Sequence, residues 1–188
     1  MAGYAHACAL AGGLKCWGSN AFGQLGDGTT VLRLTPTAVA GLGAGPVSLG
    51  RAGSAHTCVL TASGGAQCWG SNAFGQLGDG TTLDRGLPVV VSGLASGVAS
   101  VVGGYAHTCA LMSAGRVKCW GDNAFGQLGD GSSAGHDVPA DVAGLSGIIA
   151  ITGGHSHACA LNATGEAKCW GANTWGQLGD GTTTHRSA

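Results

Sequence analysis

The sequence predicts an all-β protein built from β-propeller blades, each a four-stranded antiparallel sheet, in four repeat units that form a partial propeller or part of an assembled ring. Glycine supplies 38 of the 188 residues and charged side chains only 9%, a composition that fits short strands and tight turns and excludes long helices. Near-identical segments recur about every 50 residues. Each contains two short alternating runs around a turn, which is the pattern of a β-hairpin.

The repeats define the organisation of the chain. Each repeat core has a histidine, two cysteines and a Gly-Asp-Gly run at matching places, and three connecting segments separate the cores. We therefore treat residues 1–188 as a single repeat domain. The cores span residues 3–28, 53–80, 104–131 and 154–181.

The third core shows the expected hairpin most clearly. Residues 106–111 and 116–120 alternate on either side of a three-residue turn that ends in Gly115, and glycine suits the left-handed conformation needed there. The turn sets the register, so Cys109 is expected opposite Cys119. The first core is two residues shorter, but its turn is re-centred so that the same pairing is kept.

Each connecting segment is expected to supply two further strands. In the second connector a proline is followed by the apolar run 89–91, then by Gly-Leu, then by the apolar run 98–102. Four short antiparallel strands per repeat, recurring around an axis, describe propeller blades, with a solenoid as the alternative. No apolar strand precedes Gly3 or follows Gly181, so we expect an open arc of blades.

Three motifs recur in the cores: Ala-His-x-Cys-x-Leu, Cys-Trp-Gly-x-Asn and Gly-Gln-Leu-Gly-Asp-Gly. In combination they resemble the repeat of the regulator of chromosome condensation family, and the resemblance covers essentially the whole chain. It implies a seven-bladed propeller closed by strands from both termini, although four hairpin units cannot make seven blades. It also implies guanine-nucleotide exchange on a small GTPase, the activity for which the family is named.

The eight cysteines fall into four cross-strand pairs, one in each hairpin and with none left over. Directly opposed residues lie about 4.5 Å apart at Cα, inside the range of about 4.4–6.8 Å that a disulfide tolerates. We predict four disulfides, with buried reduced thiols and a metal site as the alternatives. The predicted pairs are Cys8 with Cys16, Cys58 with Cys68, Cys109 with Cys119 and Cys159 with Cys169.

The histidine and cysteine pattern predicts no metal, no cofactor and no catalytic centre. A zinc site formed by a histidine and the two cysteines of one hairpin would lack a fourth ligand. Each histidine is instead expected to lie over a glycine of the facing strand, as His56 over Gly70. Nucleophilic catalysis needs one activated thiolate, whereas the same Cys-His pair occurs in all four repeats. We therefore predict that the chain is not an enzyme.

The remaining shared residues are assigned to the scaffold. The Gly-Gln-Leu-Gly-Asp-Gly runs lack the lysine and the strand-to-helix context of a phosphate-binding loop. Their aspartates are expected to accept hydrogen bonds from neighbouring backbone N–H groups, and the tryptophans of the cores to pack between blades. The aspartates are Asp27, Asp79, Asp130 and Asp180, and the tryptophans are Trp17, Trp69, Trp120 and Trp170.

The repeats differ most in the loops that follow Gly-Asp-Gly, at residues 31–35, 83–87 and 134–138. Function in a repeat protein is expected where the repeats differ, because the shared residues build the scaffold. We therefore predict a non-catalytic scaffold for protein–protein binding that uses these variable rim loops. The candidate partner-binding residues are Arg33, Asp84, Arg85, His136 and Asp137.

Composition narrows the partners and the location. The net charge of −1 gives no basic surface for a nucleic acid, and no apolar run approaches the roughly 20 residues that cross a membrane. Disulfides imply an oxidising compartment, so we predict an extracellular or cell-surface protein, although Met1–Tyr4 shows no signal-peptide pattern. The alternatives are an exchange factor for a small GTPase, a secreted enzyme inhibitor and a self-assembling structural protein.

Self-association is expected from the ends of the arc. The first and last repeats would expose faces and strand edges that neighbouring blades normally cover. Two arcs of four hairpin units could close head-to-tail into an eight-bladed ring, or fail to close and polymerise. The sequence therefore predicts a homo-oligomer.

Overall fold

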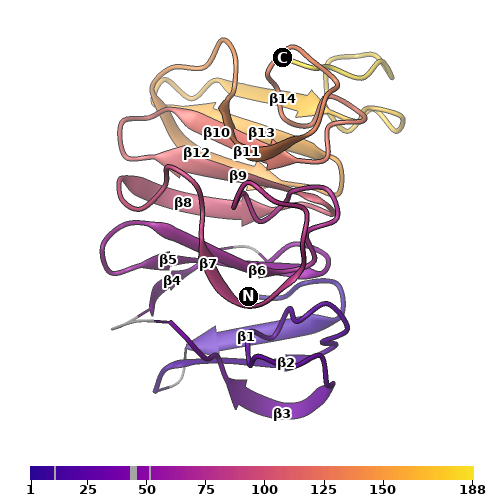
Figure 1. Ribbon diagram of the computed structural model, residues 1–188. Helices are drawn as coiled ribbons and strands as arrows, with labels where there is room; N and C mark the ends of the chain where they lie inside the picture. Colours follow the sequence, from indigo (N-terminus) through magenta and orange to yellow (C-terminus); the bar gives the residue numbers. More distant parts are fainter. Residues whose placement is uncertain (11, 43–45, 51) are drawn as a thin grey trace.

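The computed structural model describes residues 1–10, 12–42, 46–50 and 52–188, which form fourteen strands and no helix (Figure 1). The strands make four antiparallel sheets, two with four strands and two with three. Figure 1 shows these sheets stacked in chain order, from the indigo N-terminal sheet to the yellow C-terminal sheet. The predicted all-β architecture is therefore confirmed. In this part of the chain no helix is long and apolar enough to cross a membrane.

We call the four sheets blades 1 to 4. Blade 1 contains β1 (His6–Leu10), β2 (Leu14–Gly18) and β3 (Arg33–Ala38), and blade 2 contains β4 (Pro46–Leu49), β5 (His56–Thr61), β6 (Ala66–Gly70) and β7 (Arg85–Val90). Blade 3 contains β8 (Val98–Gly103), β9 (His107–Met112), β10 (Val117–Gly121) and β11 (His136–Asp141). Blade 4 contains β12 (Ile148–Gly153), β13 (His157–Asn162) and β14 (Ala167–Gly171).

The hairpin register is the one that the sequence predicts. Cys109 lies opposite Cys119 in β9 and β10, and the turn between these strands contains Gly115 with a φ of 74°. The shorter hairpin of blade 1 keeps Cys8 opposite Cys16. The deletion therefore changes the turn and leaves the pairing intact.

Each connecting segment contributes strands to two different blades. The second connector forms β7, the outer strand of blade 2, and β8, the inner strand of blade 3. One sequence repeat therefore spans a blade boundary. Among the described residues, blade 1 has only a bridge between Ala2 and Ala7 at its inner edge, and blade 4 has only a bridge between Gly171 and Arg186 at its outer edge.

The predicted rim loops are shorter than expected, because the outer strand begins inside each of them. Strand β3 starts at Arg33, β7 at Arg85 and β11 at His136. Each outer strand shifts its register just after this first pair, so its start does not follow the alternating pattern from which strands are predicted. The first pairs are Arg33 with Gly18, Arg85 with Gly70 and His136 with Gly121.

Tryptophans occupy the contact between successive blades, which we call a seam. Trp69, Trp120 and Trp170 are buried, and each donates a hydrogen bond from Nε1 to a backbone carbonyl of the preceding blade. Trp17 has no preceding blade in this chain and is only partly buried. The predicted packing between blades is confirmed for Trp69, Trp120 and Trp170. The acceptors are Gln24 O at 3.0 Å, Gln76 O at 2.9 Å and Gln127 O at 3.0 Å.

The expected stacking of each histidine over a facing glycine is wrong. The ring of His56 lies against Gly53, three residues earlier, where a Cβ atom would collide with the imidazole. Gly70 has a different reason to be glycine: its φ is 105° and a Cβ there would lie 2.6 Å from Ala55 O. The His56 ring therefore lies over the segment that leads into its own strand, and Gly70 on the facing strand allows a close backbone contact.

Candidate functional site

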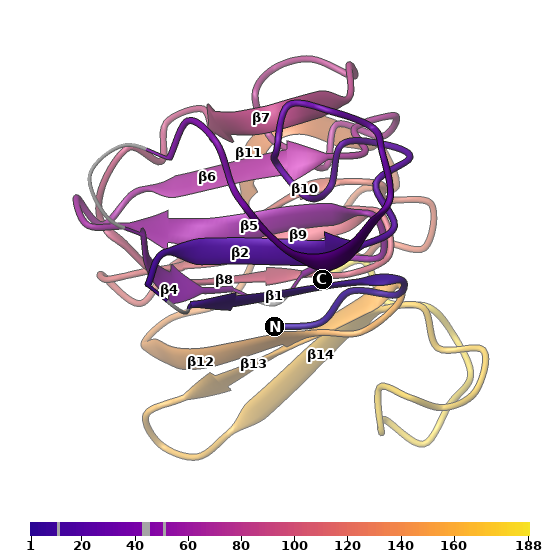
Figure 2. The ribbon, with the colours of Figure 1, turned by 90° about the horizontal axis from the view of Figure 1, so that it is seen from below.

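One end of the blades carries every long loop. In blade 3, β9 begins at His107 and β10 ends opposite it at Gly121, so the turn from β8 and the loop that leads to β11 emerge on the same side. The other blades repeat this arrangement, and Figure 2 shows the loops gathered at one end of the strands. We call this end the loop face and the opposite end, which carries the hairpin turns, the hairpin end.

The aspartate of each Gly-Asp-Gly run is tied inside its own loop. Asp27 accepts hydrogen bonds from the backbone N–H of Thr29 at 3.0 Å and from Arg33 Nε at 2.7 Å. Burial raises the pKa of Asp27, but the bonds from Thr29 and Arg33 outweigh it and lower the pKa to about 2. The turn role predicted for these aspartates is confirmed. The matching contacts are the ion pairs of Asp79 with Arg85 and of Asp180 with Arg186, both at 2.8 Å, and a hydrogen bond of 2.7 Å between Asp130 and His136.

The five predicted partner-binding residues therefore fall into two groups. Arg33, Arg85 and His136 are partly buried, each paired with an aspartate of its own loop. Asp84 and Asp137 are exposed, and neither makes an ion pair within the residues that the structure describes. Asp84 accepts a hydrogen bond from the backbone N–H of Asn72 at 2.7 Å, which fixes its position on the loop face.

Sequence reasoning missed a third aspartate without an ion pair among the described residues, Asp122, which is partly buried. Asp122 accepts hydrogen bonds from the backbone N–H of Ala124 and from the side chain of Gln127, and it makes no ion pair in the described part of the chain. The signal was present, because serine or alanine occupies the same place in the other repeats.

Sequence reasoning also missed a row of exposed aromatic side chains. Each loop contains an aromatic residue between a small residue and a glycine, and its ring points away from the core although the motif is shared. In all four loops the backbone N–H of this residue donates a hydrogen bond to the side chain of the glutamine two residues on, which fixes the turn. The exposed fractions are 45% for Phe22, 52% for Phe74, 42% for Phe125 and 88% for Trp175.

Aliphatic side chains extend this row across the seams. Leu87 of blade 2 lies against Gly28 of blade 1, and Val138 of blade 3 lies against Gly80 of blade 2. Backbone hydrogen bonds of 3.0 Å, from Gly28 N–H and Gly80 N–H to the neighbouring outer strands, hold these contacts. Leu34, Leu83, Leu87 and Val138 are all exposed. The loop face therefore exposes aliphatic as well as aromatic side chains.

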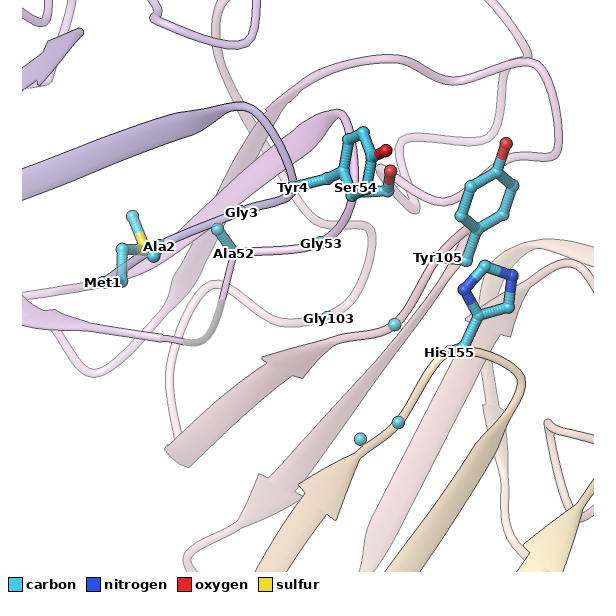
Figure 3. A pocket seen from close by; sticks show the side chains of 13 residues that line it. Met1, Ala2, Gly3, Tyr4, Ala52, Gly53, Ser54, Gly103, Tyr105 and His155 are labelled. Carbon is cyan, nitrogen blue, oxygen red and sulfur yellow. The ribbon is translucent and has the colours of Figure 1, made fainter. Parts of the chain in front are cut away.

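A pocket of about 910 Å³ lies at the inner edge of the loop face (Figure 3). In each blade the segment just before the first hairpin strand contributes glycine and one larger side chain to the lining. These side chains are Tyr4, Ser54, Tyr105 and His155. The rings of Tyr105 and His155 stack with centroids 4.4 Å apart. Among the described residues that line it there is no Asp, Glu, Lys, Arg or Cys, so these residues offer stacking and hydrogen bonding but no thiolate or carboxylate side chain.

All four predicted cysteine pairs are disulfide-bonded. The Cα atoms of each pair are 4.0 or 4.1 Å apart, and no described cysteine is free. The thiolates that a zinc site or a nucleophile would need are therefore oxidised. Across the described ranges, no group of three or more His, Cys, Asp or Glu side chains is arranged to hold a metal ion.

Buried histidines link the blades at two of the three seams. His6 Nε2 lies 2.9 Å from Thr57 Oγ1, and that hydroxyl donates to Gln24 O at 2.8 Å. Because the hydroxyl gives its proton to the carbonyl, the imidazole must carry the proton on Nε2. Desolvation lowers the pKa of His6 to about 4, so its ring is neutral at pH 7. His56, Thr108 and Gln76 repeat the link at the next seam.

Comparison with known families identifies the repeat. The regulator of chromosome condensation (RCC1) repeat matches residues 12–60, 63–111 and 114–161. A second description of the same repeat matches residues 98–127 and 148–177. Together the matches cover most of the chain.

Curated relatives share the repeat within longer proteins. The probable E3 ubiquitin-protein ligase HERC4 of Homo sapiens is 40% identical over 140 residues, which are 72% of this chain and 13% of HERC4. The ultraviolet-B receptor UVR8 of Arabidopsis thaliana is 35% identical over 144 residues, which are 75% of this chain and 33% of UVR8. The chain therefore spans a third or less of the length of these relatives.

Solved structures share the fold. Human WBSCR16 superimposes with a TM-score of 0.86 at 24% identity over 99% of this chain and 49% of its own, and Prp20p of Saccharomyces cerevisiae with 0.82 at 21% over 99% and 48%. The ectodomain of the Physcomitrella patens receptor kinase CR4 gives 0.54 at 22% over 92% and 39%. At these identities the likeness shows the fold alone.

Proposed function

Because the chain belongs to the regulator of chromosome condensation repeat family, we propose that it is a non-catalytic scaffold that binds a protein partner through its loop face. One observation carries the proposal: the loop face exposes a row of aromatic and aliphatic side chains, whereas the seams bury theirs. Exposed apolar rows of this kind mark protein interaction sites.

The variable residues have two roles in this proposal. Asp84 and Asp137 contact the partner directly, since both are exposed and make no ion pair in the described chain. Arg33, Arg85 and His136 act by holding the shape of their loops through the aspartates that they bind. Binding thus depends on exposed residues whose positions the paired residues fix.

We place the protein outside the cell or on its surface. Four disulfides fit an oxidising compartment and are rare in the cytosol. The similarity to the CR4 ectodomain shows only that a related fold occurs in the ectodomain of a receptor kinase. A secreted enzyme inhibitor would be one form of this function, because inhibition then follows from binding.

The exchange-factor alternative rests on fold alone. Prp20p, whose binding to Gsp1p and histones has been described, shares 21% identity with this chain. Likewise, the match to the ligase HERC4 covers 13% of that protein, so its activity does not transfer with the repeat. A nucleotide-release assay with purified small GTPases distinguishes an exchange factor from a binding scaffold, because accelerated release would contradict a purely binding role.

Partner capture tests the proposal directly. The immobilised protein is exposed to the secreted and cell-surface fractions of the organism that makes it, beside the Asp84→Asn/Asp137→Asn variant and the Glu166→Gln control. Glu166 is an exposed carboxylate at the hairpin end. We expect one partner to be retained by the wild type and the control and lost by the double variant. Equal capture by all three would contradict binding through the loop face.

We also propose that the chain associates with a second copy of itself. In blade 4 the side chains of Gln177 and Leu178 are only partly buried, whereas their counterparts Gln127 and Leu128 are covered by the next blade. A second copy stacked on this face would bury them. Light scattering coupled to size exclusion over a range of concentrations tests this, and a monomer at every concentration would contradict it.

A further inference from the structure

We infer that the partner presents a basic segment with apolar side chains, and that the loop face binds this segment at two neighbouring seams. This inference rests on the proposed function and names the chemistry of the partner. It is argued from the distribution of charge, from the ion pairs already made and from the position of the aromatic rings.

Charge is divided unequally between the two ends of the blades. Seven of the nine acidic residues lie on the loop face with three arginines, which gives a formal charge of −4 with histidine neutral. The described residues nearer the hairpin end carry +2, from four basic and two acidic side chains. These are Lys15, Arg116, Lys118 and Lys168 with Asp141 and Glu166.

The ion pairs sharpen this difference. Arg33, Arg85 and Arg186 each bind an aspartate of their own loop at 2.7–2.8 Å, so they offer a partner no free cation. Asp84 and Asp137 remain unpaired in the described chain and exposed. A surface whose free charges are all carboxylates attracts lysine and arginine and repels acidic proteins, nucleic acids and anionic membranes.

Aromatic rings stand beside these carboxylates at two seams. Gly75, the neighbour of Phe74, lies against the Cα of Asp137. Gly23, the neighbour of Phe22, lies against Gly86, two residues beyond Asp84. At the second seam the exposed phenyl ring is therefore next to the contact with Asp137, and at the first seam Asp84 lies two residues along the chain from the matching contact. The ring suits an apolar side chain and the carboxylate suits the head of a lysine or arginine.

The third seam differs from the first two, so the proposed binding site for the basic segment comprises two seams. There Phe125 meets His185 edge to face, with centroids 5.1 Å apart, and Gly126 lies against Ser187, so serine takes the place that Asp137 has at the seam before. A matching ligand therefore needs two apolar–basic pairs. Their separation along the ligand must span one blade.

Labelled peptides of equal length test the inference by fluorescence anisotropy. The first carries two Leu-Lys pairs joined by a Gly-Ser spacer, the second replaces both lysines by glutamate, and the third replaces both leucines by serine. We expect the first to bind, with affinity falling as salt rises, and the other two to bind at least about tenfold more weakly.

Variants of the intact chain assign the binding to the two seams. Asp84→Asn/Asp137→Asn and Phe22→Ala/Phe74→Ala should each weaken the first peptide by about tenfold or more, and Glu166→Gln should leave it unchanged. Unfolding curves that match the wild type show that the variants are folded.

Three results would overturn the inference: equal binding of the lysine and glutamate peptides, unchanged binding to the aspartate variant, or no binding of the first peptide. If partner capture by the wild type still depends on the loop face, the proposed function survives each of these results. Only the basic and apolar character assigned to the partner would then be wrong.

Discussion

The seams on either side of blade 2 contain a link that the seam between blades 3 and 4 lacks. In the first two, a buried histidine reaches a threonine hydroxyl of the next blade, and the threonine bonds a glutamine carbonyl. At the third, Ala158 stands where threonine stands in the other two, and neither ring nitrogen of His107 has a partner among the described residues.

The comparison separates what every seam needs from what some seams add. Trp170 still donates to Gln127 O at 3.0 Å in the seam that lacks threonine. The tryptophan contact is therefore common to all three seams, and the histidine link is an addition to it. In a stack of repeats each seam contributes its own share of stability, so one seam can lose a link while the others keep theirs.

The largest expected effect breaks the shared element. Trp120→Ala should lower the free energy of unfolding by about 3–5 kcal/mol, because the buried ring leaves a cavity and Gln76 O loses its donor. Trp17→Ala should cost about 1 kcal/mol, since that ring is only partly buried. Urea unfolding measures both. Similar losses at the two positions would show that the seam is not where the tryptophans act.

Lowering the pH should weaken all three seams together. Burial lowers the pKa of His6 and His107 to about 4 and that of His56 to about 3, from an ordinary value of 6.5. Below pH 6.5 the unfolded chain therefore binds protons that the folded chain does not, and stability falls as the pH drops toward 4 and below. Asp27 contributes to this loss only below its ordinary value of 3.8. Denaturant midpoints between pH 7.5 and 4 measure it, and a constant midpoint would contradict neutral buried rings.

Removing or restoring the link should have an intermediate effect. Thr108→Ala leaves His56 Nε2 without its partner and should cost about 1–3 kcal/mol. Ala158→Thr should supply the missing hydroxyl between His107 and Gln127 and stabilise the protein by about 1 kcal/mol. Thermal unfolding of both variants measures the pair of effects. Destabilisation by Ala158→Thr would mean that the third seam has no room for the larger side chain.

The smallest expected effect lies away from the seams. Asp84→Asn and Asp137→Asn should change the free energy of unfolding by no more than about 0.5 kcal/mol, because both side chains are exposed and asparagine keeps an acceptor for Asn72 N–H. Chemical unfolding beside the Trp120→Ala variant provides the scale. A loss comparable to that of the tryptophan variant would place these residues in the scaffold.

Local spacing was enough to predict the scaffold. The number of residues between two cysteines and the position of the turn glycine determine the hairpin register, and this register brings Cys58 opposite Cys68. The same reasoning placed Trp120 between blades. In these cases one short stretch of chain contains all the information that the prediction needs.

Contacts that depend on the folded loop could not be predicted in this way. Arg85 reaches Asp79 because six residues of loop bring it back, and His56 meets Gly53 because the chain turns before β5. Phe74 received no role from the sequence, because it lies in a segment that the repeats share, yet its ring is 52% exposed. A shared residue can belong to a repeated surface as well as to a repeated core.

The placement of one sequence repeat across a blade boundary has a genetic consequence. The repeat matches begin at residues 12, 63 and 114, in or next to the hairpin turns, so each unit carries both sides of one seam. Duplication or deletion of a unit between two such turns would add or remove one blade. At the new junction the first strand of one hairpin would be followed by the second strand of another, which is the strand order of every existing blade. Gene rearrangement can therefore lengthen the loop face by one blade at a time without creating a mismatched seam.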